Sequence, residues 1–192
     1  MTGLHPARTA VLSMDMQSGI VAACAGDDLV SRAAQVLRRC RSAGSTVIHV
    51  RVGFRPGFPE INPRNAMFSA IRSSPRWQQM FEGSASEVHP ALGPLENDIV
   101  VTKHRVNAFL GTDLEMILLA QGIESLVLFG IASSGVVLST LVHASDADYQ
   151  LTVQRDCCAD QDPEVHACLM EKVFPRRATV LDAEEFLAGL PG

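Results

Sequence analysis

Short, almost purely apolar segments alternate with segments whose apolar residues recur at helical spacing. Continuous apolar runs are typical of strands in a parallel sheet, because helices cover both faces of such a sheet. These runs predict strands at residues 9–16, 46–52, 98–102, 125–131, 151–155 and 178–181. Helical spacing predicts helices at residues 28–43, 113–120, 134–147, 162–173 and 183–190. The alternation predicts one α/β domain over residues 1–192, a three-layer α/β/α sandwich with a six-stranded, mostly parallel, Rossmann-like sheet.

The segment 53–95 departs from this alternation. It is rich in proline and holds the only tryptophan, Trp77. An insertion of this length between strands is often a lid over an active site, and the other interpretation is ordered surface packing. The first strand is not followed by G-x-G-x-x-G, and G-x-x-x-x-G-K-[ST] does not occur. The usual dinucleotide and P-loop sites of this architecture are therefore not indicated.

Charge and cysteine content exclude several classes of protein. The formal net charge is −5 and basic residues are scattered, whereas a nucleic-acid-binding protein carries a basic stripe. The five cysteines are odd in number and two are adjacent, which does not suit a secreted disulfide framework. No apolar run approaches the roughly 20 residues of a membrane span, and the N-terminus does not resemble a secretory leader. We expect a cytoplasmic protein with reduced thiols and no nucleic-acid or membrane partner.

One group of residues has side chains that can bind metals. Cys157, Cys158, His166 and Cys168 lie close together in the sequence, but a structural zinc site usually has separated pairs of ligands. We interpret the thiols as buried side chains beside a helix. We therefore expect no metal and no other cofactor.

Polar residues end several of the predicted strands. Asp15 closes the first strand, Lys103 follows the third, and the fourth runs through Gly130 into a helix that starts at residues 133–135. In open parallel sheets, ligands bind beyond the carboxyl ends of the strands. We therefore expect a carboxylate, an ammonium group and a helix N-terminus to meet at one edge of the sheet. A buried charge is tolerated far better in a pair, so the two side chains form either a plain salt bridge or the centre of a site.

Three motifs, in this order, resemble those of the isochorismatase-like family. They are V-L-S-M-D-M-Q, V-V-T-K-H-R-V-N-A-F and F-G-I-A-S-S-G-V-V-L-S-T, and the resemblance extends over nearly the whole chain. The family includes isochorismatases and cysteine amidohydrolases such as nicotinamidases, and its usual triad is an aspartate, a lysine and a cysteine. The resemblance implies a hydrolase in which Asp15 and Lys103 take the first two positions.

The third position of the triad departs from the family pattern G-x-x-T-x-x-C-V. We interpret the turn from Gly130 to Val136 as a compacted form of this pattern, with Gly135 in the place of the cysteine. Glycine has no side chain with which to attack a carbonyl, so covalent acyl transfer at this position is excluded. Cys157 and Cys158 end a different strand, so we do not expect either thiol to replace the missing nucleophile. Ser134 is one residue before Gly135, and one step along a helix turns a side chain by about 100°, so we do not expect its hydroxyl to point where the cysteine would.

A branch of the family resembles this chain in carrying glycine at that position. True isochorismatases and related phenazine-pathway enzymes hydrolyse a vinyl ether, which yields pyruvate without a covalent intermediate. Their motif K-x-R-x-[SN]-A-F is matched by Lys103, Arg105, Asn107, Ala108 and Phe109. The resemblance implies that Asp15 is the general acid, that Lys103 and Arg105 pair with substrate carboxylates, and that Gly135 leaves room for the substrate. We further expect the N–H groups of the helix start to attract the negative oxygens of the substrate.

The predicted catalytic residues are thus Asp15, Lys103 and Gly135, acting on a small carboxylate. The predicted substrate-binding residues are Gln17, Phe54, Arg55, Arg105, Asn107, Ser133 and Ser134. The alternative is a relative of the cysteine amidohydrolases that has lost its nucleophile and binds a ligand without turnover. Apolar residues cover much of helix 134–147, which suggests subunit contacts, and we expect a homo-oligomer, a dimer or a tetramer.

Overall fold

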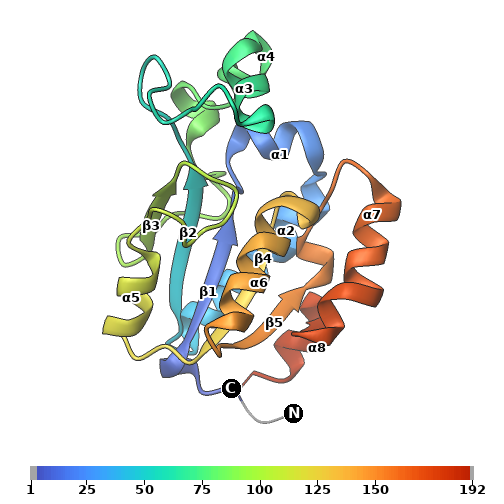
Figure 1. The fold of residues 1–192 in the computed structure, drawn as a ribbon. Coiled ribbons are helices and arrows are strands. Elements are labelled where there is room, and N and C mark those ends of the chain that lie inside the picture. Colours follow the sequence, from blue (N-terminus) through green and yellow to red (C-terminus); the bar gives the residue numbers. More distant parts are fainter. Residues whose placement is uncertain (1–3, 191–192) are drawn as a thin grey trace.

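The computed structural model describes residues 4–190, and its centre is a six-stranded sheet with the strand order β3-β2-β1-β4-β5-β6 (Figure 1). All five pairings between neighbouring strands are parallel. The strands are β1 (Thr9–Met14), β2 (Thr46–Val52), β3 (Ile99–Lys103), β4 (Ser125–Gly130), β5 (Gln150–Gln154) and β6 (Thr179–Leu181). Each lies within two residues of its predicted bounds. The predicted fold class is confirmed.

Helices cover both faces of the sheet. They are α1 (Ser18–Cys24), α2 (Asp27–Ser42), α3 (Ala66–Ser73), α4 (Pro75–Gln79), α5 (Leu114–Ala120), α6 (Leu138–Asp146), α7 (Pro163–Cys168) and α8 (Ala183–Ala188). In Figure 1, α5 and α6 lie in front of the sheet and α2 lies behind it, where α2 contacts α8. Two predicted helices contain irregular turns: a π-helical turn, Ser133–Val137, precedes α6, and a second, Leu169–Val173, follows α7.

The two central strands carry the core. Every residue of β1 and β4 is buried, which explains why both segments are nearly continuous apolar runs. The apolar side of the helix after β4 packs into the same core, where Val136, Val137 and Leu141 are almost fully buried. These side chains are therefore used inside the chain and do not indicate a subunit contact. The dimer or tetramer stays a prediction.

The segment 53–95 is ordered and lies beyond the C-terminal ends of the strands, where α3, α4 and α1 come together (Figure 1). Ile61, Phe68 and Ile71 form a small apolar core of its own, against which Phe54 and Phe81 pack. The segment thus covers the edge of the sheet at which the predicted site residues end their strands.

Within residues 4–190, no helix combines the length and the apolar character needed to cross a membrane.

Candidate active site

Asp15 and Lys103 meet at the C-terminal edge of the sheet, as predicted. Lys103 is the last residue of β3, and its Nζ lies 2.8 Å from Oδ2 of Asp15, which follows β1. Nζ also donates a hydrogen bond to the carbonyl oxygen of Arg105 at 3.0 Å. The exposed fractions of the two side chains are only 3% for Lys103 and 10% for Asp15, so the pair is buried. Parallel strands that end at one edge bring together residues 88 positions apart.

The backbone of Asp15 is held in an unusual conformation. Its φ is 55°, in the left-handed region that residues other than glycine seldom adopt. The backbone N–H of Asp15 donates to the carbonyl of Val50 at 2.7 Å, which continues the sheet for one more bond. A residue persists in this region when its surroundings hold it there, often at a functional site.

Asp15 lines a cavity of about 280 Å³ that is partly open to solvent, and Lys103 and Arg105 also line it. Among residues 4–190, no hydrogen-bond partner exists for the buried Oδ1 of Asp15. Burial raises the pKa of Asp15, and the opposing influence of Lys103 does not cancel this rise. The carboxyl group therefore takes up a proton more readily than an exposed aspartate, and one of its buried oxygens has no hydrogen-bond partner among the described residues.

Apolar side chains from the segment 53–95 form much of the cavity wall. They are Met67, Phe68, Ile71, Trp77 and Phe81. Met67 and Trp77 are also exposed, with exposed fractions of 58% and 38%, so they stand between the cavity and solvent. Of the two interpretations of this segment, the one that places it over the site agrees with the structure.

The turn after β4 closes the cavity on its other side. Gly130 has φ 150°, and a Cβ there would lie 2.0 Å from the carbonyl oxygen of Met14, so only glycine fits. The peptide between Ile131 and Ala132 is cis. Gly135 and Val136 then line the cavity. The nearest atoms to a Cβ built on Gly135 are 3.9 Å away, an ordinary van der Waals contact, so a methyl group would fit at this position.

The helix start does not offer its N–H groups as expected. The N–H of Ser133 donates to the carbonyl of Ala159 at 2.9 Å, and that of Gly135 donates to the carbonyl of Ala132 at 3.1 Å. The N–H of Ser134 donates to the Asp160 carboxylate at 2.7 Å. The expectation that these three groups attract substrate oxygens is therefore wrong, because each already has an acceptor. Asp160 instead adds a negative charge to the cavity wall.

Two predicted substrate-binding residues are used to connect segments of the chain. The buried side chain of Gln17 donates to the carbonyls of Val52 and Ser86 and accepts from the N–H of Val52. It thereby joins the end of β2 to the segment 53–95. The Oγ of Ser133 lies 2.8 Å from Nδ1 of His166 and is fully buried. Neither side chain lines the cavity.

Three more predicted binding residues lie outside the cavity wall, whereas Arg105 and Ser134 belong to it. Phe54 packs in the aromatic cluster of the segment 53–95. Arg55 forms an exposed ion pair with a nearby glutamate. The side-chain oxygen of Asn107 accepts from the N–H two residues later, at 2.8 Å. All three side chains are used in local contacts of their own loops.

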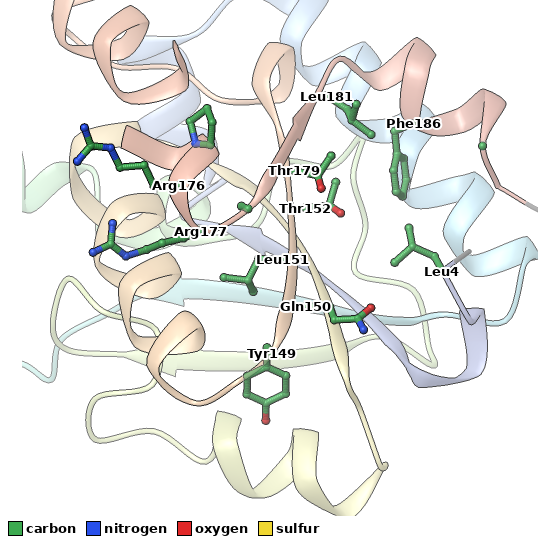
Figure 2. Close-up of a pocket in the computed structure, with 13 residues that line it drawn as sticks. Leu4, Tyr149, Gln150, Leu151, Thr152, Arg176, Arg177, Thr179, Leu181 and Phe186 are labelled. Atoms are coloured by element: carbon green, nitrogen blue, oxygen red, sulfur yellow. The ribbon is translucent and has the colours of Figure 1, made fainter. Parts of the chain in front are cut away.

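A larger hollow of about 640 Å³ lies at the start of β5 (Figure 2). It is lined partly by Gln150 and Thr152, and Figure 2 shows Arg176 and Arg177 pointing away from these two side chains. None of the described buried polar atoms without a partner belongs to its lining. The cavity at Asp15 is therefore the stronger candidate for the active site, although it is the smaller of the two.

A family model decides what kind of domain carries this site. The model of the isochorismatase domain matches residues 9–185. The chain belongs to the isochorismatase family. It is an isochorismatase-family hydrolase, as its three motifs predicted.

Relatives of this isochorismatase-family chain cover almost its whole length. The uncharacterized isochorismatase family protein YecD of Escherichia coli O157:H7 is 33% identical over 197 residues, which cover 99% of this chain and 100% of the relative. Maleamate amidohydrolase of Pseudomonas putida is 29% identical, over 90% of this chain and 76% of the relative. An isochorismatase family protein from Burkholderia thailandensis has a similar structure, with a TM-score of 0.86, 29% identity, and 98% and 97% of the two chains covered.

The family pattern G-x-x-T-x-x-C-V can also be counted along this turn without compaction. Counted from Gly130, it places Ser133 at the threonine and Val136, rather than Gly135, at the cysteine. Both Gly135 and Val136 line the cavity, and neither has a nucleophilic side chain. Either count leaves this isochorismatase-family site without the thiol of the usual triad.

The cysteines of the chain are distributed between core and surface. Cys157 and Cys158 are buried away from the cavity, and burial raises the pKa of Cys158 to about 12. Cys24, at the end of α1, lines the cavity and was not predicted. Over the described range, no three His, Cys, Asp or Glu side chains gather as metal ligands.

Asp160 and Gln161 were also missed as cavity residues. A signal for them existed in the sequence, because both lie shortly after the predicted fifth strand, at the same edge of the sheet as Asp15.

Proposed function

We propose that this isochorismatase-family chain hydrolyses a vinyl ether of a small carboxylate without a covalent intermediate and releases pyruvate. The observation that carries the proposal is Asp15, which lines the cavity and whose buried Oδ1 has no hydrogen-bond partner within residues 4–190. A carboxylic acid can protonate carbon near neutral pH only when its pKa is raised, and burial raises the pKa of Asp15. Neither Gly135 nor Val136, the two candidates for the position of the family cysteine, has a nucleophilic side chain, which favours direct attack by water.

The reaction has three steps. Asp15 transfers its proton to the terminal CH₂ carbon of the vinyl ether, which gives an oxocarbenium ion and a carboxylate. A water molecule adds to the cationic carbon and returns a proton to Asp15. In the resulting hemiketal the hydroxyl proton moves to the ether oxygen, the carbon–oxygen bond to that oxygen breaks so that it leaves as an alcohol, and the former hydroxyl oxygen forms the C=O bond of pyruvate. Water is consumed and the carboxyl group is regenerated.

Lys103 has two roles in this scheme. Its ammonium group, 2.8 Å from Asp15, stabilises the carboxylate that forms after proton transfer. It also stands beside the position of the substrate carboxylate. Arg105 adds a second positive charge, and its guanidinium lies 5.5 Å from the centre of the Phe68 ring while donating to the carbonyls of Glu60 and His104. These contacts hold the guanidinium at the cavity wall.

The cavity suits a small substrate with an apolar body. Its volume of about 280 Å³ is slightly below the usual range of ligand pockets, which is roughly 300–1,000 Å³. The side chains from the segment 53–95 exclude bulk water from the acid, which strengthens its interaction with developing charge. General acid catalysis contributes about 10²–10⁴-fold, and orientation and electrostatic stabilisation would supply the remainder.

The test is pyruvate release from isochorismate, followed through a coupled assay with lactate dehydrogenase. We expect the wild type to form pyruvate and Asp15→Ala to form none. Asp113→Ala is the matched control, because Asp113 is exposed and its side chain makes no capping hydrogen bond. Loss of activity in the control, or retention of activity in Asp15→Ala, would contradict the proposed role of Asp15.

The second candidate is ligand binding without turnover, by a relative of the cysteine amidohydrolases. The absence of a thiol at both Gly135 and Val136 favours it, since the amidohydrolase reaction needs that nucleophile. Isothermal titration with isochorismate distinguishes the two. Tight binding with no pyruvate from wild-type protein would support the second candidate and exclude the first.

A further inference from the structure

The charged groups around the cavity are divided between two sides of Asp15. Lys103 and Arg105 come from β3 and the loop after it, at one edge of the sheet. Asp160 comes from the loop after β5, on the other side of β1. In the part of the chain that the structure describes, Asp15 and Asp160 are the two carboxylates that line the cavity. A ligand in the cavity therefore has two cations on one side and an anion on the other.

Asp160 is fixed in place and ionised. Its Oδ2 accepts from the N–H of Ser134 at 2.7 Å, and its Oδ1 accepts from the N–H of Asp162 at 3.4 Å. Burial raises the pKa of Asp160, but these hydrogen bonds outweigh that influence and the pKa is lowered. The bridge between Ile131 and Ala159 anchors the loop just before Asp160. The carboxylate is thus a preorganised negative charge.

A second hollow of about 500 Å³ adjoins the cavity at Asp160. The two share Cys24, Trp77, Asp160 and Gln161, so Asp160 lies on the boundary between them. Arg76 lines this outer hollow, and no described carboxylate lies within salt-bridge distance of its guanidinium. A substrate that extends from the cavity toward this outer hollow would lie beside the Asp160 carboxylate.

We propose that Asp160 determines substrate specificity by binding a hydrogen-bond donor, a hydroxyl or an ammonium group, on the side of the substrate opposite its carboxylate. The inference rests on the proposed function for the position of that carboxylate beside Lys103 and Arg105. A substrate that places a second carboxylate against Asp160, rather than beside Lys103 and Arg105, is disfavoured because the two negative charges repel each other. A neutral apolar end leaves the Asp160 carboxylate desolvated without compensation.

The test measures binding, so it does not depend on turnover. The probes are 4-(aminomethyl)benzoate and 4-methylbenzoate, which share a ring and a carboxylate and differ in the donor at the far end. We expect isothermal titration to show that wild-type protein binds the aminomethyl probe about tenfold more tightly, as a charge-assisted hydrogen bond implies. Asp160→Asn should bind both probes equally, because the amide oxygen keeps the bond from Ser134 but carries no charge.

Asp162→Asn is the matched control. Asp162 caps α7 by accepting from the N–H groups of Glu164 and Val165, it does not line either hollow, and asparagine caps helices equally well. This variant should keep the tenfold preference. If Asp160→Asn does not fold, Asp160→Ser replaces it, since a serine hydroxyl can also accept from a helix N–H.

Three results would overturn the inference: equal binding of the two probes by the wild type, failure of both to bind it, or a preference that survives removal of the Asp160 charge. A chain that shows the preference but releases no pyruvate from isochorismate would retain the specificity role of Asp160 while losing the proposed reaction. A chain that releases pyruvate and shows no preference would lose only the specificity role.

Discussion

Replacing Gly135 by alanine separates the structural role of this glycine from its role at the cavity. Gly135 lies inside the helical segment after β4, where glycine is destabilising by about 0.5–1 kcal/mol relative to alanine. A Cβ added there would lie 3.9 Å from its nearest neighbours, the side chains of Ala132 and Val106, so no atom has to move. We therefore expect Gly135→Ala to raise the free energy of unfolding by about 0.5–1 kcal/mol, or the melting temperature by roughly 1–4 °C.

The same methyl group should reduce activity. It would project into a cavity of about 280 Å³ in which the substrate is proposed to bind. Overfilling a packed site typically costs about 1–3 kcal/mol, which corresponds to roughly a 5- to 150-fold loss of kcat/KM for pyruvate release. The variant should thus be more stable and less active than the wild type.

Urea denaturation and steady-state kinetics on the same preparation test both effects. Gly19→Ala is the structural counterpart, because its Cβ would lie 3.0 Å from the backbone oxygen of Met80 and would have to displace it. That variant should lose about 1–3 kcal/mol of stability. A destabilised Gly135→Ala protein would refute the argument that a methyl group fits at this position without displacing its neighbours. A stabilised one with unchanged kcat/KM would show that the substrate does not approach Gly135.

Three further predictions concern titratable groups. The kcat/KM for pyruvate release should fall as pH rises through the raised pKa of Asp15. Because Lys103 lowers that pKa, Lys103→Met should move this fall to higher pH. An unchanged pH profile in the variant would exclude Asp15 as the acid. Iodoacetamide should modify Cys24 but not the core thiol Cys158, and Cys24→Ser should still form pyruvate, as mass spectrometry and the coupled assay would show. Asp98→Asn should cost about 1–3 kcal/mol at pH 7, because the carboxylate pairs with an arginine of α2 at 2.6 Å. Burial raises the pKa of Asp98, but its hydrogen bonds lower this pKa by more, so the contribution is lost as pH falls through the lowered value. The urea melts of wild type and variant should therefore differ at pH 7 and converge once the pH lies below the lowered pKa of Asp98.

Much of the architecture follows from local patterns. Strands buried on both faces must be apolar throughout, so β1 and β4 could be located from the sequence alone. The meeting of Asp15 with Lys103 was also predictable, because parallel strands end at one edge of the sheet and both residues end strands. The family followed from three motifs in order. In each case the residues concerned lie in, or directly after, a regular element.

The tertiary structure alone decided which polar side chains are free to act. Gln17 and Ser133 looked like binding residues, but partners distant in the sequence use their hydrogen bonds. The N–H groups of the helix start also donate hydrogen bonds within the chain, one of them to Asp160. A side chain has a limited number of donors and acceptors, and whether they are occupied depends on long-range packing. The local pattern of the sequence does not show whether a polar group already has a hydrogen-bond partner. The order of apolar and polar residues does show which segments are buried and where strands end.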